Sequence, residues 1–251
     1  MIRLVASDLD GTLLYPDGQL PQGIFEVIEQ LHAKGILFVA ASGRQHGNLR
    51  RLFAPVKDKI AFIAENGAIA QDGDQLWTVP FKEEWRSQIV NDLKAAGMLP
   101  MVSQPGSVFV EDTDRAFTDD LVYRLRNTLT VVDDVAQLEG EVIKISGYHR
   151  DGVAPLCGEM MKKWGGKLNC AVAGHRWFDL TCANKATGLE KIMASRGIRP
   201  EEAAAFGDQF NDAPMLAAVG HAYVMAHADD ALCLPGYQRC QRVLPILQQI
   251  V

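Results

Sequence analysis

Two aspartates separated by one residue follow the first largely apolar segment of this 251-residue chain. Residues 2–7 are typical of a buried β-strand, and Asp8-Leu9-Asp10-Gly11 comes directly after them. A strand that ends in a tight, glycine-containing turn places such carboxylates at the carboxyl edge of a parallel sheet, where open α/β folds bind their ligands. Two anions this close repel each other unless a cation lies beside them. The pattern therefore predicts a site for a divalent metal that prefers oxygen ligands.

Three further polar groups lie where an expected strand or loop meets a helix. Ser42-Gly43-Arg44 follows the second expected strand, where a hydroxyl and the N–H groups that open a helix can bind an anion. Lys185 precedes a later helix and can neutralise phosphoryl oxygens. Residues 207–212 follow another strand and supply two carboxylates and an amide. Together these groups provide a carboxylate nucleophile, a nearby acid/base, metal ligands and phosphate donors, which is the set that phosphoryl transfer needs.

Each group also has a structural interpretation when it is taken alone. The Asp8–Gly11 segment could be a polar turn or part of a calcium loop, although Gln19 stands where an EF-hand requires an acid. Ser42 could cap a helix, Lys185 could be a solvated lysine, and residues 207–212 could form a surface turn. Their occurrence together at strand ends is what favours the functional interpretation.

The composition is that of an ordinary globular protein, with 48% hydrophobic and 22% charged residues. A net charge of −6 argues against a broad basic face for nucleic acid. The five cysteines include no Cys-x-x-Cys pair, so neither a zinc site nor a disulfide framework is indicated, which fits a reducing cytoplasm. No apolar run approaches the roughly 18 residues of a membrane span. We expect an untargeted cytoplasmic protein with no nucleic-acid, membrane or obligate protein partner.

Strand and helix signals alternate over the first 80 residues and again after Lys185. This alternation predicts an α/β fold with a Rossmann-like, three-layer core around a parallel sheet. The expected core strands lie at 2–7, 36–41, 60–64, 203–206 and 222–225, with helices at 21–35, 44–53, 186–196, 212–218 and the chain end, and a hairpin at 68–79.

Residues 81–181 have a different pattern, in which helices are interleaved with strands of an antiparallel type. We therefore expect a core made from residues 1–80 and 182–251, with residues 81–181 inserted as an α+β domain. The expected helices of this domain lie near 82–96, 116–128 and 153–163, and its strands near 107–111, 141–148, 167–173 and 176–180.

In order and spacing, these motifs resemble those of the haloacid dehalogenase (HAD) superfamily of phosphohydrolases, and the resemblance spans the whole chain. It is carried by Asp8-Leu9-Asp10-Gly11-Thr12, by Ser42-Gly43, by Lys185 and by the 207–212 segment. Glu65-Asn66-Gly67-Ala68 after the third strand is similar to the Cof-like subfamily. The insert resembles the type IIB cap of the Cof-like sugar-phosphate phosphatases.

The resemblance implies a role for each matched residue. Asp8 would attack phosphorus to form an aspartyl phosphate, and Asp10 would protonate the leaving alcohol and then activate water. The implied substrate is a small phosphorylated metabolite, with a sugar phosphate favoured, over which the insert closes. Phosphate binding is implied for Ser42, Gly43, Lys185 and Asn211. Mg²⁺ would be held by Asp8, the backbone carbonyl of Asp10 and Asp208, with Asp212 on one of its waters or just outside its ligands.

The chain departs from the family pattern in two places. Lys185-Ala186-Thr187-Gly188-Leu189 stands where Cof-like relatives have Lys-Gly-x-Ala-Leu, and this exchange of small residues should preserve packing. Ala226-His227-Ala228 replaces a Gly-Asn-Ala segment, so substrate contacts made there in relatives are not expected to carry over. We do not expect His227 itself to be a site residue.

Two other functions use the same residues. A phosphomutase would return the phosphoryl group to its product, and a non-enzymatic module would only bind metal and phosphometabolite. Intact Asp8, Asp10, Lys185 and Asp208 argue against the second. In the insert, Lys144, His175, Arg176 and Trp177 could face a substrate, but a polar rim is the commoner explanation for such residues.

Overall fold

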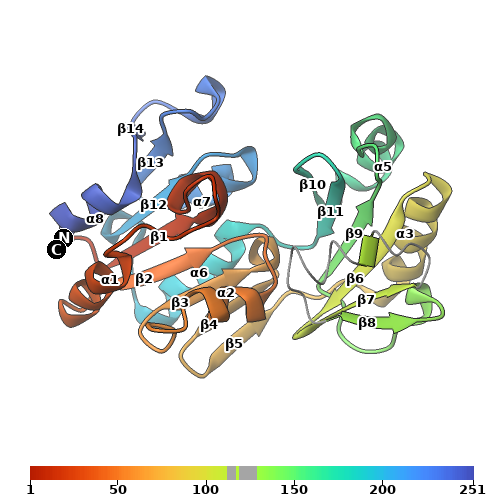
Figure 1. Cartoon of the computed structure of the whole chain (residues 1–251), viewed down its shortest axis with the longest axis horizontal. Coiled ribbons are helices and arrows are strands. Elements are labelled where there is room, and N and C mark those ends of the chain that lie inside the picture. Colours follow the sequence, from red (N-terminus) through yellow and green to blue (C-terminus); the bar gives the residue numbers. More distant parts are fainter. Residues whose placement is uncertain (112–116, 119–128) are drawn as a thin grey trace. The chain divides into compact units, whose positions relative to one another are not determined.

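The chain forms two compact units in a computed structural model that describes residues 1–111, 117–118 and 129–251 (Figure 1). The first unit, here called the core, contains Met1–Arg44, Leu49–Trp77 and Asn184–Val251. The second, here called the insert, contains Gln45–Asn48 and Thr78–Ala183. The core is therefore built from chain segments on both sides of the insert.

The core sheet has eight strands in the order β14-β13-β12-β1-β2-β3-β4-β5. Neighbours from β14 to β3 pair in parallel, whereas β4 runs antiparallel to β3. Every residue of β1, β2, β3 and β12 is buried, as expected for parallel strands covered on both faces. The strands are β1 (Leu4–Asp8), β2 (Leu37–Ala41), β3 (Ala61–Ala64), β4 (Ile69–Asp72), β5 (Gln75–Thr78), β12 (Ala203–Gly207), β13 (His221–Met225) and β14 (Gln238–Cys240).

Helices cover the two faces of this sheet and form the outer layers. On one face lie α1 (Ile24–Ala33), α2 (His46–Leu52) and α8 (Val243–Ile250) (Figure 1). Helix α1 packs against α8, and the ring of Phe53 contacts those of Phe38 and Phe62. On the other face lie α6 (Lys185–Arg196) and α7 (Ala213–Ala217), whose apolar side chains join those of β1, β2 and β12. The helices thus bury both faces and leave the strand ends for other side chains.

The insert contains a six-stranded sheet in the order β10-β11-β9-β6-β7-β8. Its pairs are antiparallel except for β7 with β8, which are parallel. Apolar side chains of α3 and α5 pack against one face of this sheet. The elements are α3 (Glu83–Ala95), α5 (Cys157–Trp164), β6 (Leu99–Gln104), β7 (Ser107–Glu111), β8 (Leu129–Val132), β9 (Lys144–Tyr148), β10 (Asn169–Ala173) and β11 (Trp177–Thr181).

The predicted α/β fold class, with a three-layer core and an inserted α+β domain, is confirmed. Strands β6, β8 and β14 were not predicted, because β6 contains Pro100 and the other two are short. The core sheet is mixed rather than wholly parallel, since the expected hairpin adds β4 and β5 to its edge. The helix expected at 116–128 lies outside the described residues except for 117–118.

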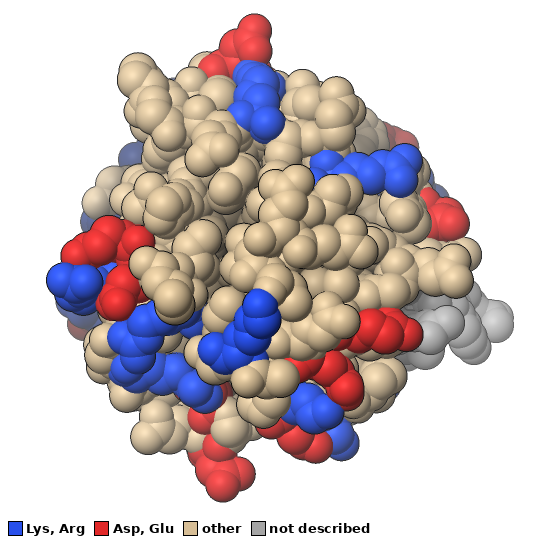
Figure 2. All heavy atoms as spheres, turned by 90° about the vertical axis from the view of Figure 1, so that its left-hand side faces the viewer, with Lys and Arg blue, Asp and Glu red and all other residues tan. Residues whose placement is uncertain are grey.

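Surface charge on the side of the molecule that carries α8 and both chain ends is mixed. Figure 2 shows acidic and basic side chains interspersed there around uncharged surface, so charges of one sign do not dominate this face. Among the described residues, every helix is too short or too polar to cross a membrane.

The loop after β3 requires glycine at position 67. Glu65, Asn66 and Gly67 all have positive φ angles, of 50°, 55° and 96°. A Cβ atom on Gly67 would lie 1.8 Å from the backbone oxygen of Asn184, the residue that precedes α6. This glycine therefore allows the β3 loop to pack directly against the start of α6.

We expect Gly67→Ala to lower the free energy of unfolding by several kcal/mol, because it combines an unfavourable φ with a backbone clash. Gly18→Ala is the matched control, since Gly18 has a φ of 80° and a Cβ added there would have no atom within 4 Å. The control should lose only about 1 kcal/mol. Urea unfolding of both variants checks this, and equal losses would show that the close approach to Asn184 does not matter.

Candidate active site

The predicted site residues lie on loops that follow neighbouring parallel strands. Asp8 is the last residue of β1, and Asp208 directly follows β12, which pairs with β1. Ser42 directly follows β2, the neighbour of β1 on its other side. The strand order therefore brings these residues to one edge of the sheet, as the sequence predicts.

Three carboxylates meet at this edge. One oxygen from each of Asp8, Asp208 and Asp212 lies within 4.8 Å of the others, and all three residues are buried. The side chain of Asp10 is not part of this cluster. Among the described residues, these three carboxylates form the one cluster close enough to hold a cation together.

Lys185 lies within the acidic cluster and is itself only 1% exposed. Its Nζ donates to Asp8 Oδ1 and to Asp212 Oδ1, each at 2.5 Å. Burial alone would lower the pKa of Lys185, but the two carboxylates outweigh it and raise this pKa above its usual range. Lys185 is therefore a permanent positive charge between the two aspartates.

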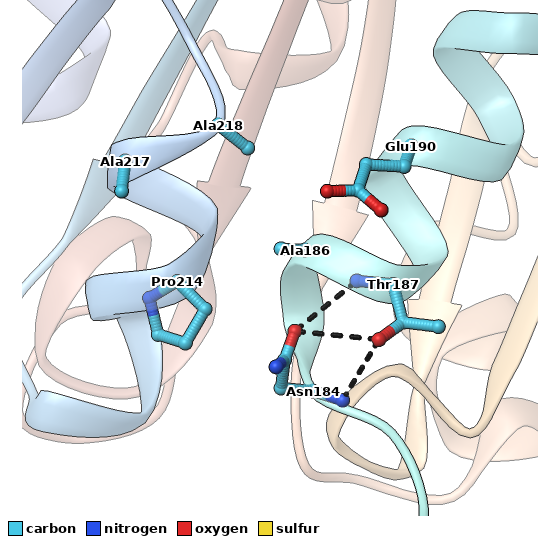
Figure 3. A pocket seen from close by; sticks show the side chains of 7 residues that line it. All are labelled: Asn184, Ala186, Thr187, Glu190, Pro214, Ala217 and Ala218. Carbon is cyan, nitrogen blue, oxygen red and sulfur yellow. Dashed lines mark hydrogen bonds between the residues drawn. The ribbon is translucent and has the colours of Figure 1, made fainter.

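The N-terminal cap of α6 fixes the backbone position of Lys185. Lys185 is the first residue of α6, and Asn184 and Thr187 form a capping box around it (Figure 3). Asn184 Oδ1 accepts from Thr187 N at 3.2 Å, and Thr187 Oγ1 accepts from Asn184 N at 3.2 Å. Gly188, one of the exchanged small residues, packs so closely on β3 that a Cβ would lie 2.9 Å from Ile63 Cγ2. The first turn of α6 is thus held at both its cap and its buried face.

Asp208 and Asp212 are oriented by hydrogen bonds from their own loop and from the loop after β1. Thr12 Oγ1 donates to Asp208 Oδ1 at 2.9 Å, and Gln209 Nε2 donates to Asp208 Oδ2 at 3.1 Å. The backbone N–H groups of Asp208 and Gln209 donate to Asp212 Oδ2 at 3.0 and 3.1 Å. Because Lys185 Nζ donates to the other oxygen, Asp212 Oδ1, both oxygens of this carboxylate accept hydrogen bonds.

Two glycines permit this close packing of carboxylates. A Cβ on Gly11, whose φ is 86°, would lie 2.3 Å from Asp208 Oδ2. A Cβ on Gly207 would lie 2.5 Å from that of Asp212. Larger residues at either position would displace the carboxylates that form the cluster.

Three of the four predicted phosphate-binding residues are linked through Asn66. Its backbone N–H donates to the carbonyl of Ser42, and its Oδ1 accepts from Asn211 Nδ2 at 3.4 Å. A Cβ on Gly43 would lie 2.9 Å from the same Oδ1, so Gly43 also packs on Asn66. The strained backbone of Asn66 thus connects Ser42 and Gly43 to Asn211, which neighbours Asp212.

Asp10 lies outside the buried cluster and forms an ion pair with Arg44. The Asp10 side chain is 60% exposed, and both of its oxygens accept from the Arg44 guanidinium. Sequence reasoning assigned no role to Arg44, Asn66, Thr12 or Gln209. The position of Arg44 could have indicated this contact. It follows Ser42-Gly43 at the end of β2, and β2 neighbours β1, the strand that precedes Asp10.

His227 lies nearer to the site than expected. Its Nε2 is 3.4 Å from Asp208 Oδ2, although 59% of its side chain is exposed. In the insert, His175 and Arg176 are exposed as a polar rim would be, whereas Lys144 and Trp177 are buried. Lys144 Nζ lies 3.8 Å from Asp179 Oδ2, and the Trp177 ring packs on that of Tyr148. The rim explanation is therefore wrong for these two residues.

An α/β core that gathers a buried lysine and three buried aspartates at one edge of its sheet can bind a cation and an anionic ligand side by side. The chain belongs to the haloacid dehalogenase-like hydrolase family, whose model matches residues 5–234. The predicted family and the enzyme class, a HAD-type phosphatase, are confirmed.

Named relatives include two phosphatases of Escherichia coli strain K12. The chain is 27% identical over 241 residues to 5-amino-6-(5-phospho-D-ribitylamino)uracil phosphatase YbjI, covering 92% of this chain and 88% of that protein. It is 26% identical over 251 residues to pyridoxal phosphate phosphatase YbhA, covering 92% and 90%.

Solved structures share the fold over nearly the whole chain. A protein from Eubacterium rectale superposes with a TM-score of 0.89 at 28% identity, covering 100% of this chain and 99% of that one. The HAD subclass IIB sugar phosphatase BT4131 superposes with a TM-score of 0.77 at 20% identity, covering 92% and 90%. The second likeness is one of fold.

The buried Asp8 predicts an unusual pH dependence of stability in metal-free protein. Burial is the main cause that raises its pKa to about 7, Lys185 opposes this rise, and Asp212 and Asp208 add to it. In the unfolded chain the pKa is near 3.8. Between about pH 4 and about pH 7, Asp8 is ionised in the unfolded chain but still protonated in the folded protein. The free energy of unfolding therefore falls as pH rises through this range, and the loss remains at higher pH.

We therefore expect Asp8→Asn in EDTA to match the wild type at pH 4 and to be more stable at pH 8, by on the order of a few kcal/mol. Urea unfolding across this pH range measures the difference. A difference that does not change with pH would contradict the raised pKa.

Proposed function

We propose that this chain is a Mg²⁺-dependent phosphatase that hydrolyses a small phosphorylated metabolite through an aspartyl phosphate on Asp8. The observation that carries the proposal is the buried Lys185 ammonium, which contacts Asp8 and Asp212 next to Asp208. Lysine in this position both lowers the repulsion among the acids and provides a charge for phosphoryl oxygens.

The residues present fit a hard divalent cation. Three buried carboxylates surround one ammonium group, so negative charge exceeds positive charge and the ligand atoms are oxygens. We propose that Asp8, the Asp10 backbone carbonyl and Asp208 hold Mg²⁺, with Asp212 just outside these ligands, where Lys185 and two backbone N–H groups orient it. Bound Mg²⁺ would reduce repulsion between nucleophile and phosphate and stabilise charge on the transferring group.

The protein's own groups would divide the remaining work. Ser42, the Gly43 N–H, Lys185 and Asn211 would bind the phosphoryl oxygens, a grouping supported by the Asn66 link between Ser42 and Asn211. The Asp8 carboxylate would attack phosphorus as the bond to the leaving oxygen breaks. Asp10 would give that oxygen its proton, and would then take a proton from the water that attacks phosphorus. The second step releases inorganic phosphate and restores Asp8.

The names of the relatives support the proposed substrate class. The two E. coli relatives are named for small phosphorylated metabolites. We propose that the α+β domain predicted at residues 81–181, which forms most of the insert, acts as the cap that excludes bulk water and selects the leaving group. We favour a sugar phosphate among such substrates. We place this reaction in the cytoplasm.

We expect Asp8→Asn to abolish phosphate release from sugar phosphates, pyridoxal phosphate and p-nitrophenyl phosphate, by at least on the order of 10³-fold, because the amide cannot form the covalent intermediate. Phosphate release is measured with and without Mg²⁺, and circular dichroism verifies folding. Asp17→Asn, the same exchange at an exposed acid, is the control and should remain active.

Full turnover by the Asp8→Asn variant would contradict the assignment of the nucleophile. Conversion of one sugar phosphate into its isomer without net phosphate would instead identify a phosphomutase. Binding without turnover by the wild type would identify a binding module.

A further inference from the structure

We infer that Arg44 is a positioning residue that holds the Asp10 carboxylate in place for proton transfer. The inference rests on the proposed function, and in particular on the role of Asp10 toward the leaving oxygen. Its basis is the two-point contact between these residues. Arg44 Nε donates to Asp10 Oδ2 at 2.9 Å, and Arg44 Nη2 donates to Asp10 Oδ1 at 2.5 Å.

The register of the core sheet produces this contact. Strands β1 and β2 pair in parallel with Asp8 opposite Ala41. Asp10 lies two residues beyond the end of β1, and Arg44 lies three residues beyond the end of β2. The two loops therefore leave the sheet side by side, and the long arginine side chain spans the gap to the aspartate. Serine and glycine at 42 and 43 contact Asn66, so the backbone that carries Arg44 is itself held.

Asp10 needs such a contact because its own surroundings do not fix it. Its side chain is 60% exposed, and it lies in a turn with non-helical backbone angles beside Gly11. An exposed aspartate samples several rotamers, whereas proton transfer requires a carboxyl oxygen within hydrogen-bond distance of the reacting oxygen. A planar guanidinium that donates to both oxygens fixes the rotation of the carboxylate as well as its position.

Stability does not account for the pair, since exposed ion pairs contribute little to folding. The core contains a second pair of the same geometry, in which Arg196 donates to both oxygens of Asp72 at 2.5 and 2.6 Å. This pair joins α6 to β4, away from the acidic cluster. Arg196→Ala therefore controls for the loss of a two-point arginine–aspartate contact in this fold, in this case to an aspartate whose side chain is only 8% exposed.

The experiment compares kcat/KM for two leaving groups. p-Nitrophenolate leaves readily without a proton, whereas the alkoxide of glucose 6-phosphate, or of whichever sugar phosphate the wild type hydrolyses fastest, does not. We expect Arg44→Ala and Asp10→Asn to lower kcat/KM for the sugar phosphate on the order of 10²-fold and for p-nitrophenyl phosphate by only a few fold. The kcat/KM of the Asp10→Asn/Arg44→Ala double variant should equal that of Asp10→Asn within about twofold, because both changes remove the same function.

A second readout follows from the role of Asp10 in activating water. With p-nitrophenyl phosphate, Arg44→Ala should release a rapid burst of nitrophenolate and then turn over more slowly than the wild type, since the aspartyl phosphate persists. Arg196→Ala should behave as the wild type. Arg44→Lys keeps the charge but not the two-point contact, and it should show the same leaving-group pattern in a folded protein if Arg44→Ala misfolds.

Three results would overturn the inference. Equal losses for both substrates with a raised KM would show that Arg44 binds the phosphate directly. Additive losses in the double variant would show that it acts independently of Asp10, and unchanged kinetics would show that the pair has no role. These results are distinguishable from a failure of the proposed function, which would be seen as turnover by the Asp8→Asn variant.

Discussion

The buried contact of Lys185 with Asp8 and Asp212 is the interaction on which the rest of this structure depends. Three carboxylates cannot be buried together at the end of a sheet without a compensating charge. The Lys185 ammonium group, 2.5 Å from the carboxylates of Asp8 and Asp212, supplies part of this compensating charge. The remaining negative charge favours a cation beside Asp8 and Asp208, so the same interaction both reduces repulsion among the buried acids and leaves the cluster suited to bind a cation.

The surrounding core serves to bring chain segments far apart in sequence to this contact. Parallel pairing of β1 with β12 and β2 aligns their carboxyl ends, and the Asn184–Thr187 capping box starts α6 at the same edge. Glycines at 11, 67 and 207 allow backbone and carboxylates to approach more closely than any side chain would permit. The site is therefore made of loops whose positions are set by buried strands.

The sequence was sufficient to predict which residues meet but not how they pair. Asp8, Lys185, Asp208 and Asp212 each stand at the end of an apolar strand or the start of a helix, so their convergence follows from the α/β alternation. The contacts of Arg44 with Asp10 and of Asn66 with Asn211 depend on strand order and loop geometry, which local patterns do not encode. Strand β6 was missed because it contains Pro100, and β14 because its three residues are too few to show a pattern.

The central claim is that the phosphoryl group passes through Asp8, and a covalent intermediate tests it most directly. Wild-type protein with Mg²⁺ is mixed with ³²P-labelled substrate, quenched in acid within milliseconds, digested and mapped. We expect a transient label on the peptide that contains Asp8, removed by hydroxylamine as acyl phosphates are and absent from Asp8→Asn. Label on another peptide, or turnover with no labelled protein at any time, would contradict it.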